Sequence, residues 1–124
     1  MVRACFSRLP IVFLVARGFE PRAAQLDILM DIDTLTTAMH AFVESKGWYA
    51  PDSLRPQTPR NLAISLVLES SEVLEHFQWR DEPTDKAELA SELADVMLYL
   101  LQLSSISGID LGQAVLDKLD VNYG

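Results

Sequence analysis

Two stretches decide the fold: residues 59–79 read PRNLAISLVLESSEVLEHFQW, and residues 84–107 read TDKAELASELADVMLYLLQLSSIS. In both stretches, apolar residues recur at the three- and four-residue spacing of an amphipathic α-helix. Thr58 suits the N-cap of the first helix, Pro59 suits its first position, and Thr84 suits the N-cap of the second helix. We therefore predict a helix over each stretch.

One further helix is predicted on either side of this pair. Apolar residues recur at helical spacing over residues 31–46, and Gly47 follows as a stop signal. After the second stretch, Gly108 supplies the left-handed residue that commonly ends a helix. Asp110 and the glutamine three residues later resemble a capping box, which predicts a last helix through about residue 121.

The remaining segments are connections between helices. Three prolines fall within residues 49–59, and residues 80–83 turn the chain. The sequence shows no strand alternation and no hairpin signal. Because each helix must bury its apolar face against another, we predict an all-α fold, a four-helix bundle.

The composition excludes several classes of function. The chain has 124 residues, which is enough for one domain with a modest core, and its net charge is -8. Nucleic acids select clustered Lys and Arg, so we expect no nucleic-acid binding, and a polyanionic ligand would need a metal ion. The single cysteine, Cys5, cannot form an internal disulfide, so we expect a cytoplasmic protein.

The first 29 residues differ from the rest in charge. Residues 1–29 hold four arginines and two acids, whereas residues 30–124 hold six basic and sixteen acidic residues. The apolar run from Leu9 to Ala16 is shorter than the roughly 20 residues that span a membrane. Basic residues precede this run, so a signal peptide is the alternative. We predict a domain at 30–124, a disordered or spurious extension at 1–29, and no membrane contact.

Each of the two decisive stretches carries an acidic pair: Glu69 with Glu72, and Glu92 with Asp95. At about 100° per residue, Glu69 and Glu92 each lie about 20° from a leucine of the apolar stripe. Surface carboxylates normally lie opposite that stripe, so both pairs are expected to face inward. In an antiparallel packing the four carboxylates would converge, and burying them requires protons or cations. Oxygen ligands without His or Cys suit Mg²⁺ or Mn²⁺, so we predict a divalent metal site.

Two other interpretations of the acids are open. The carboxylates could be boundary residues that reach solvent or pair with Arg and Lys, although two inward pairs on neighbouring helices argue against this. A di-iron redox bundle would use Glu-x-x-His, and no histidine stands three residues after Glu69, Glu72 or Glu92. His76 lies one turn after Glu72, and we interpret it as a polar boundary residue.

These residues resemble one known family. The segments ESSEVLEHFQW at 69–79 and ELADVMLY at 92–99 resemble the MazG-like nucleotide pyrophosphohydrolases of the dCTP-pyrophosphatase type, and the similarity extends over about 31–122. The resemblance implies an all-α enzyme that cleaves a nucleoside or deoxynucleoside triphosphate between the α and β phosphates. The products would be the monophosphate and pyrophosphate. It also implies a homo-oligomer, either a dimer or a tetramer.

The resemblance assigns roles to individual residues. It implies that Glu69, Glu72, Glu92 and Asp95 hold Mg²⁺, with Glu69 or Glu72 as the general base. Further residues would bind the substrate directly. Arg and Lys side chains would bind the phosphates, and aromatic or amide side chains would bind the base. These candidates are Trp48, Arg60, Asn61, Trp79, Tyr99, Lys118 and Asn122. Core packing, solvent exposure and helix capping are the alternative accounts of these residue types.

Two departures from the family pattern concern binding. The connection after Trp48 is rich in proline, where many relatives have a shorter segment with a histidine, and this bears on base selection. The sequence stops at Gly124, where relatives usually continue, so part of the pocket is expected to be missing or to come from another subunit.

We predict Mg²⁺-dependent hydrolysis of nucleoside triphosphates that serves to clean the nucleotide pool. The alternative is a non-catalytic helical module for nucleotide binding or oligomerisation. A homo-oligomer is also expected because apolar residues occur away from the acidic face of both decisive helices. These residues are Ile64, Val67, Leu74, Met97, Leu98 and Leu101.

Overall fold

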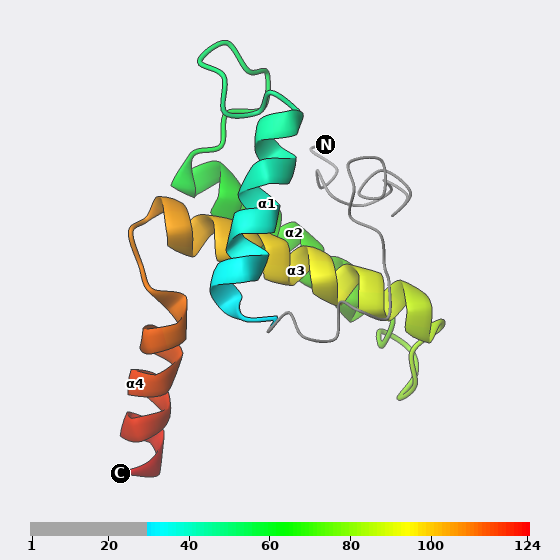
Figure 1. Cartoon of the computed structure of the whole chain (residues 1–124). Helices are drawn as coiled ribbons and strands as arrows, with labels where there is room; N and C mark the ends of the chain where they lie inside the picture. Colours follow the sequence, from blue (N-terminus) through cyan, green and yellow to red (C-terminus); the bar gives the residue numbers. More distant parts are fainter. Residues whose placement is uncertain (1–29) are drawn as a thin grey trace, which may run out of the picture.

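The computed structural model describes residues 30–124, and within this range the chain forms helices and no strand (Figure 1). The helices are α1 (Ile32–Ser45), α2 (Pro59–Glu75), α3 (Lys86–Ile106) and α4 (Leu111–Tyr123). The predicted all-α architecture is thereby confirmed. The predicted extension at 1–29 lies outside the described residues.

Side-chain caps fix where the helices begin. Thr58 accepts a hydrogen bond from the backbone N–H of Asn61, so the predicted start of α2 is confirmed. The predicted cap of α3 is wrong by one residue, because Asp85 and not Thr84 accepts hydrogen bonds from the N–H groups at the start of the helix. Asp110 caps α4 by accepting from the Gln113 N–H.

Helix α2 ends earlier than predicted. It stops at Glu75, whereas the apolar pattern extends to Trp79. The N–H groups of His76 and Phe77 bond to carbonyls three residues back, and this tightening is typical of a terminal turn. The turn leaves Trp79 outside the helix. Gly108 has a φ of 69°, which confirms its predicted helix-ending conformation.

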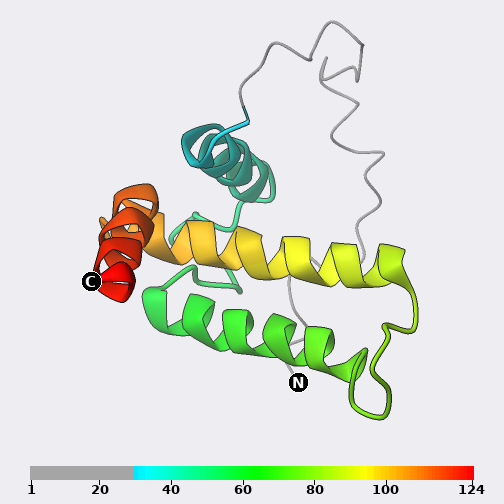
Figure 2. The same ribbon diagram turned by 90° about the horizontal axis from the view of Figure 1, so that it is seen from below.

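Helix α3 is the centre of the fold. Helices α2 and α3 run antiparallel side by side, α1 packs on another side of α3, and α4 projects from the end of α3 (Figures 1 and 2). Leu62 of α2 and Tyr99 of α3 form one buried cluster. Met39 and Val43 of α1 form a second cluster with Leu101 of α3. Two small cores therefore hold α3 on two sides.

Helix α3 is also long and apolar enough, by length and composition alone, to cross a membrane. It has 21 residues, with a mean hydropathy of 1.3 in its most apolar window. The same property is expected of the central helix of a bundle, and α3 contacts α1, α2 and α4. We therefore interpret α3 as a core helix.

The apolar residues away from the acidic face, from which we expected a homo-oligomer, divide into two groups. Those of α3, namely Met97, Leu98 and Leu101, pack in the cluster with α1 and need no second copy to cover them. Those of α2 do face outward: Ile64, Val67 and Leu74 are exposed. Helix α4 has no buried residue and carries further exposed apolar side chains, namely Val115, Leu116, Leu119 and Val121.

Candidate metal centre

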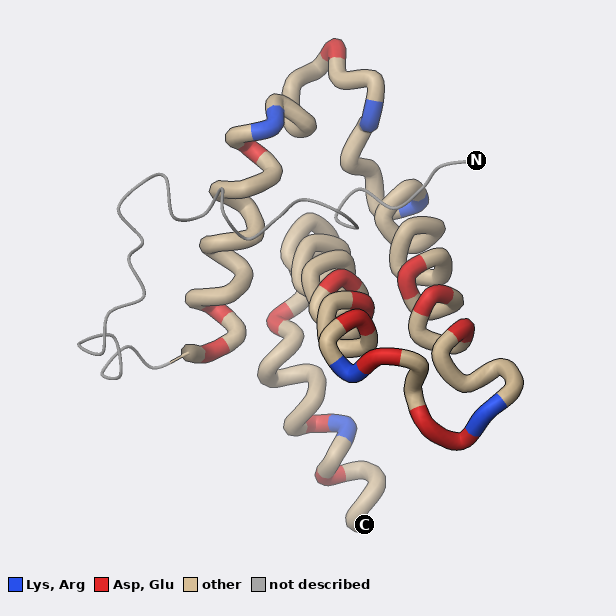
Figure 3. Tube along the Cα trace, turned by 90° about the vertical axis from the view of Figure 1, so that its right-hand side faces the viewer, with Lys and Arg blue, Asp and Glu red and all other residues tan. Residues whose placement is uncertain are grey.

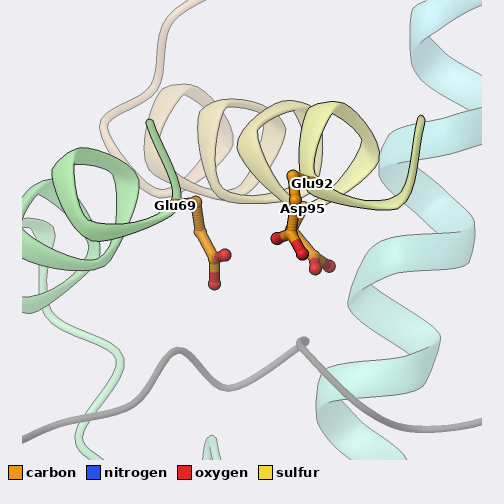
Figure 4. A group of neighbouring side chains, drawn as sticks. All are labelled: Glu69, Glu92 and Asp95. Atoms are coloured by element: carbon orange, nitrogen blue, oxygen red, sulfur yellow. The ribbon is translucent and has the colours of Figure 1, made fainter. Parts of the chain in front are cut away.

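Three acidic side chains meet between the antiparallel helices. Glu69 comes from the middle of α2, and Glu92 and Asp95 come from the first half of α3 (Figure 4). One carboxylate oxygen of each lies within 4.8 Å of the others. The three-residue spacing of Glu92 and Asp95 places both on the face of α3 that meets α2. The predicted convergence of the two acidic pairs is therefore observed for these three residues.

The cluster is withdrawn from water. Glu69 is 0% exposed and Asp95 is buried, while Glu92 is half-buried. Both carboxylate oxygens of Glu69 and one of Glu92 are buried and have no hydrogen-bond partner among the described residues. Burying an unpaired carboxylate costs several kcal/mol unless a proton or a cation neutralises it. Orphaned oxygens aimed at one point are therefore what a cation site requires.

The ionisation of the cluster reflects this burial. Burial, and after it the charges of Asp95, Glu72 and Glu92, raise the pKa of Glu69 to about 8. Burial, and then hydrogen bonding and repulsion from Glu72, raise the pKa of Glu92 to about 7. Burial, and then the charge of Glu72, raise the pKa of Asp95 to about 6. Without a cation, the cluster therefore retains protons near neutral pH.

Glu72 lies beside the group of three. It is half-buried one turn after Glu69, and it interacts with Glu92 closely enough to raise the pKa of that carboxyl by hydrogen bonding and repulsion. It is not one of the three residues whose oxygens share the 4.8 Å group. Its role as a fourth ligand or as a general base stays a prediction.

The donor set fits a hard divalent cation. Three carboxylates provide oxygen ligands only, and the group contains no histidine or cysteine. Oxygen donors of this kind suit Mg²⁺ and Mn²⁺, whereas iron and zinc sites commonly include nitrogen or sulfur ligands. His76, which we interpreted as a boundary residue, is buried at the end of α2, and it stands outside the group.

The acids also dominate the surroundings of the cluster. Figure 3 shows Asp and Glu positions gathered along the second half of α2 and the first half of α3, while Lys and Arg lie at the ends of these helices, in the connections and on α4. An anionic phosphate chain therefore needs a cation between itself and these helices.

Two of the predicted base-binding aromatic residues, Trp48 and Tyr99, pack in or against the hydrophobic core. Trp48 is half-buried, with its ring edge-on to Phe42 and the Arg55 guanidinium 5.6 Å from its centre. Tyr99 is buried against Leu62 one turn after Asp95. These positions agree with the packing alternative for both residues and leave a substrate role as a prediction.

The remaining predicted substrate residues lie at the surface or on α4. Arg60 is exposed at the start of α2, and the amide of Asn61 donates to the Pro56 carbonyl. Trp79 is 86% exposed in the turn after α2. Lys118 and Asn122 are exposed on α4, which projects away from the α2–α3 pair, so the structure does not bring them to the acids of the same chain (Figure 1).

Sequence analysis missed a chain of polar contacts beside the core. His40 Nδ1 lies 2.6 Å from the Tyr49 hydroxyl, and His40 Nε2 lies 2.7 Å from Ser105 Oγ. Gln102 Nε2 donates to the Tyr49 hydroxyl at 3.2 Å and to Gln57 Oε1 at 2.9 Å. The one available signal was a glutamine at position 102 inside an otherwise apolar run, because no sequence spacing links the other members.

Comparisons with known proteins identify a family and its relatives. The family model of the MazG nucleotide pyrophosphohydrolase domain matches residues 57–120, which include all four acids. The dCTP pyrophosphatase 1 proteins of Mus musculus and Homo sapiens are each 41% identical over 73 residues, covering 52% of this chain and 43% of the relative. The alignment thus spans less than half of the length of these relatives. A solved pyrophosphatase from Archaeoglobus fulgidus superposes with a TM-score of 0.64 and 33% identity, covering 77% of this chain and 91% of that chain.

Proposed function

The chain belongs to the MazG nucleotide pyrophosphohydrolase family, as its sequence resemblance indicated, and on this premise we propose that it hydrolyses nucleoside triphosphates. The products are a nucleoside monophosphate and pyrophosphate. The observation that carries the proposal is the convergence of Glu69, Glu92 and Asp95, with buried oxygens that lack partners. In a cell, such an activity would remove unwanted nucleotides from the pool.

The proposed division of labour follows from burial. Glu69, Glu92 and Asp95 would hold Mg²⁺ or Mn²⁺, because their oxygens converge, and Glu72 would complete the set. A bound divalent ion neutralises phosphate charge and makes a nearby water molecule more acidic. Glu72 is the better placed of the two candidates for general base, because it adjoins the cluster and Glu69 has both oxygens buried at the centre. A base at the rim can exchange its proton with solvent.

The decisive experiment identifies the products. Purified protein is incubated with each ribo- and deoxyribonucleoside triphosphate and Mg²⁺, and the products are separated by chromatography. We expect monophosphate and pyrophosphate in equal amounts. Diphosphate with orthophosphate would refute cleavage between the α and β phosphates, and nucleotide binding without any turnover would favour the non-catalytic module.

The metal dependence is tested in the same assay. Excess EDTA should abolish turnover, and Mg²⁺ or Mn²⁺ should restore it, because the carboxylates alone repel a triphosphate. Undiminished turnover in EDTA would refute the proposed role of the acids.

We also propose that the working form is a homo-oligomer. The exposed apolar side chains of α2 and α4 have no cover among the described residues, and a second copy would bury them. Lys118 and Asn122 could then act at the acidic cluster of a neighbouring copy, which their own helix does not reach.

A further inference from the structure

A cavity of about 190 Å³ opens where the connection before α2 meets the α2–α3 pair. Its polar lining includes Gln57, Asn61 and Ser65, and its apolar walls include Leu62 and Tyr99. Pockets for drug-sized ligands occupy roughly 300–1,000 Å³, so this cavity is sized for a fragment of a nucleotide. Apolar walls with a few polar groups are what a planar heterocyclic base needs.

The cavity lies about one helical turn from the acids, along the α2–α3 pair. Ser65 precedes Glu69 by one turn of α2, and Tyr99 follows Asp95 by one turn of α3. Because α2 and α3 are antiparallel, both steps point the same way, and each covers about 6 Å along the helix axis. This separation allows a nucleotide with its phosphates at the acids to place its sugar and base in the cavity.

Gln57 lines this cavity with a side-chain amide whose hydrogen-bonding capacity is only partly satisfied. Its Nε2 donates to the Arg55 carbonyl at 2.7 Å, and its Oε1 accepts from Gln102 Nε2 at 2.9 Å. A primary amide has two N–H donors and two acceptor lone pairs, so one N–H and one lone pair of Gln57 are left. An adjacent donor and acceptor is the pattern with which amide side chains recognise base edges.

The orientation of Gln57 is imposed from beneath by Gln102. Gln102 is 0% exposed, and its Oε1 has no hydrogen-bond partner among the described residues. Leaving a buried carbonyl without a hydrogen-bond partner is costly, so packing alone does not explain a glutamine here. Turning the Gln57 amide over would set its Nε2 against the Gln102 Nε2 donor and its oxygen against the Arg55 carbonyl, so these two contacts fix the orientation of the Gln57 amide.

Further contacts hold Gln102 itself. The Tyr49 hydroxyl accepts from Gln102 Nε2, which leaves the hydroxyl hydrogen for His40 Nδ1. His40 then carries its proton on Nε2 and donates it to Ser105 Oγ. Gln102 therefore donates in two directions, to Gln57 on one side and through Tyr49 toward His40 and Ser105 on the other.

We propose that Gln57 is a specificity-determining residue that reads the edge of the substrate's base in this cavity, and that Gln102 is a positioning residue that holds Gln57 for this task. The inference rests on the proposed function for the class of ligand, a nucleoside triphosphate. It adds the site that distinguishes one base from another.

Gln57→Glu tests the reading of the base. A carboxylate only accepts hydrogen bonds, and guanine alone presents two adjacent donors, N1–H and N2–H, on one edge. The ratio of kcat/KM for dGTP to that for each other deoxynucleotide should therefore rise roughly fivefold or more over wild type. Gln78→Glu, which adds the same charge in the exposed turn after α2, should leave the ratios unchanged. Unchanged ratios in Gln57→Glu, or equal changes in both variants, would overturn the proposal.

A double-mutant cycle tests the role of Gln102. Gln102→Leu removes the donor to Gln57 while keeping an aliphatic side chain, and it should raise KM and reduce the differences between bases with little change in kcat. Combined with Gln57→Leu, it should add nothing to the base ratios, because Gln102 acts through Gln57. Additive effects on the ratios would overturn the positioning role.

Binding measured without turnover separates this inference from the proposed function. Titration calorimetry in EDTA follows the four deoxynucleosides, which carry no phosphate charge, with wild type and with a folded Gln57→Leu variant. Selective binding that Gln57→Leu abolishes supports the inference even if no triphosphate is hydrolysed. Hydrolysis without any dependence of binding or kcat/KM on residue 57 overturns the inference while leaving the proposed function intact.

Discussion

Packing of α2 against α3 removes the Glu69 carboxylate from water without giving it a hydrogen bond from the described residues. Such a group is stable only as the neutral acid or beside a cation. An acid selected only for folding would be replaced by an apolar residue at little cost. We therefore interpret Glu69 and its neighbours as a binding site in which a cation offsets the cost of burying the carboxylates.

The substitution Glu92→Gln separates a functional cluster from a structural one. Removing one charge while keeping the shape relieves repulsion, so in EDTA the variant should be as stable as wild type or more stable. In Mg²⁺ the order should reverse, because wild type gains binding free energy that the variant loses. Hydrolysis should fall by orders of magnitude. Thermal melts in both conditions, with a hydrolysis assay, measure these effects.

The matched control is Glu82→Gln, which removes one charge from the exposed turn before α3. It should change neither the response to Mg²⁺ nor turnover. A Glu92→Gln protein that is destabilised equally in EDTA and Mg²⁺, and that still hydrolyses substrate, would contradict the metal centre.

The raised pKa values predict how stability depends on pH in metal-free protein. Burial raises the pKa of Glu69 to about 8, and it raises the pKa of Glu92 and of Asp95 less far. Between about pH 4 and pH 8 the folded protein therefore binds more protons than the unfolded chain, so stability falls as pH rises through this window. Below about pH 4 the three acids are protonated and their burial costs no ionisation free energy. Above about pH 8 all three are ionised and the full cost of burying their charges applies.

The expected loss is on the order of a few kcal/mol, since one unit of pKa corresponds to about 1.4 kcal/mol. Urea unfolding in EDTA across this range measures it. Glu92→Gln should flatten the curve, and Mg²⁺ should stabilise the protein most at high pH, where the ligands are ionised. A stability that rises from pH 5 to pH 8 in EDTA, equally in wild type and variant, would be inconsistent with buried acids.

At the level of residues, the convergence of Glu69, Glu92 and Asp95 could be predicted from the sequence, whereas the contact between Gln57 and Gln102 could not. The acids were predictable because their helical spacing sets them on the apolar face, and only one partner helix was available nearby. Gln57 and Gln102 were not, because their contact depends on the path of an irregular connection. Helical periodicity does not describe such a path.

At the level of elements, cap chemistry decides the start of α3. Asp85→Ala should destabilise the protein by about 1 kcal/mol, because two N–H groups of the first turn lose their acceptor. Thr84→Ala, one residue earlier, should have little effect. Urea unfolding of both variants measures the difference. A larger loss in Thr84→Ala than in Asp85→Ala would restore the cap that we first predicted.

The existence of all helices in residues 30–124 was predictable, but some of their ends were not. Two good capping residues, Thr84 and Asp85, stand side by side, and the sequence alone does not choose between them. The apolar run through Phe77 and Trp79 continues the helical pattern, although the backbone tightens after Glu75. Periodicity reports which face is apolar, while hydrogen bonding of the last turn decides where a helix stops.

At the level of the whole molecule, an uncovered apolar surface predicts self-association. Val67 is 68% exposed on the outer face of α2, and α4 contributes no buried residue. Light scattering at micromolar concentration should give a mass of at least a dimer. Val67→Glu should lower that mass, because a charge on an apolar interface is costly to bury. Ala50→Glu, in the exposed connection after α1, should not.

A monomeric mass for wild type would refute the oligomer. The apolar surface behind this prediction could be predicted only in outline from sequence. Apolar residues were expected away from the acidic face on both helices, but those of α2 are exposed, whereas those of α3 are covered by α1. The apolar patterns of α2 and α3 are similar, but their apolar residues differ in exposure because α1 packs against α3.

The placement of the acids within a single helical hairpin also has a kinetic consequence. Helices α2 and α3 are neighbours along the chain, and among the helices of residues 30–124 their pairing is the most extensive. Local pairings of this kind close short loops and tend to form early in folding. The hairpin that we expect to nucleate the fold therefore brings like charges together at its first step. Divalent cations should act on the rate of folding as well as on the stability of the folded protein.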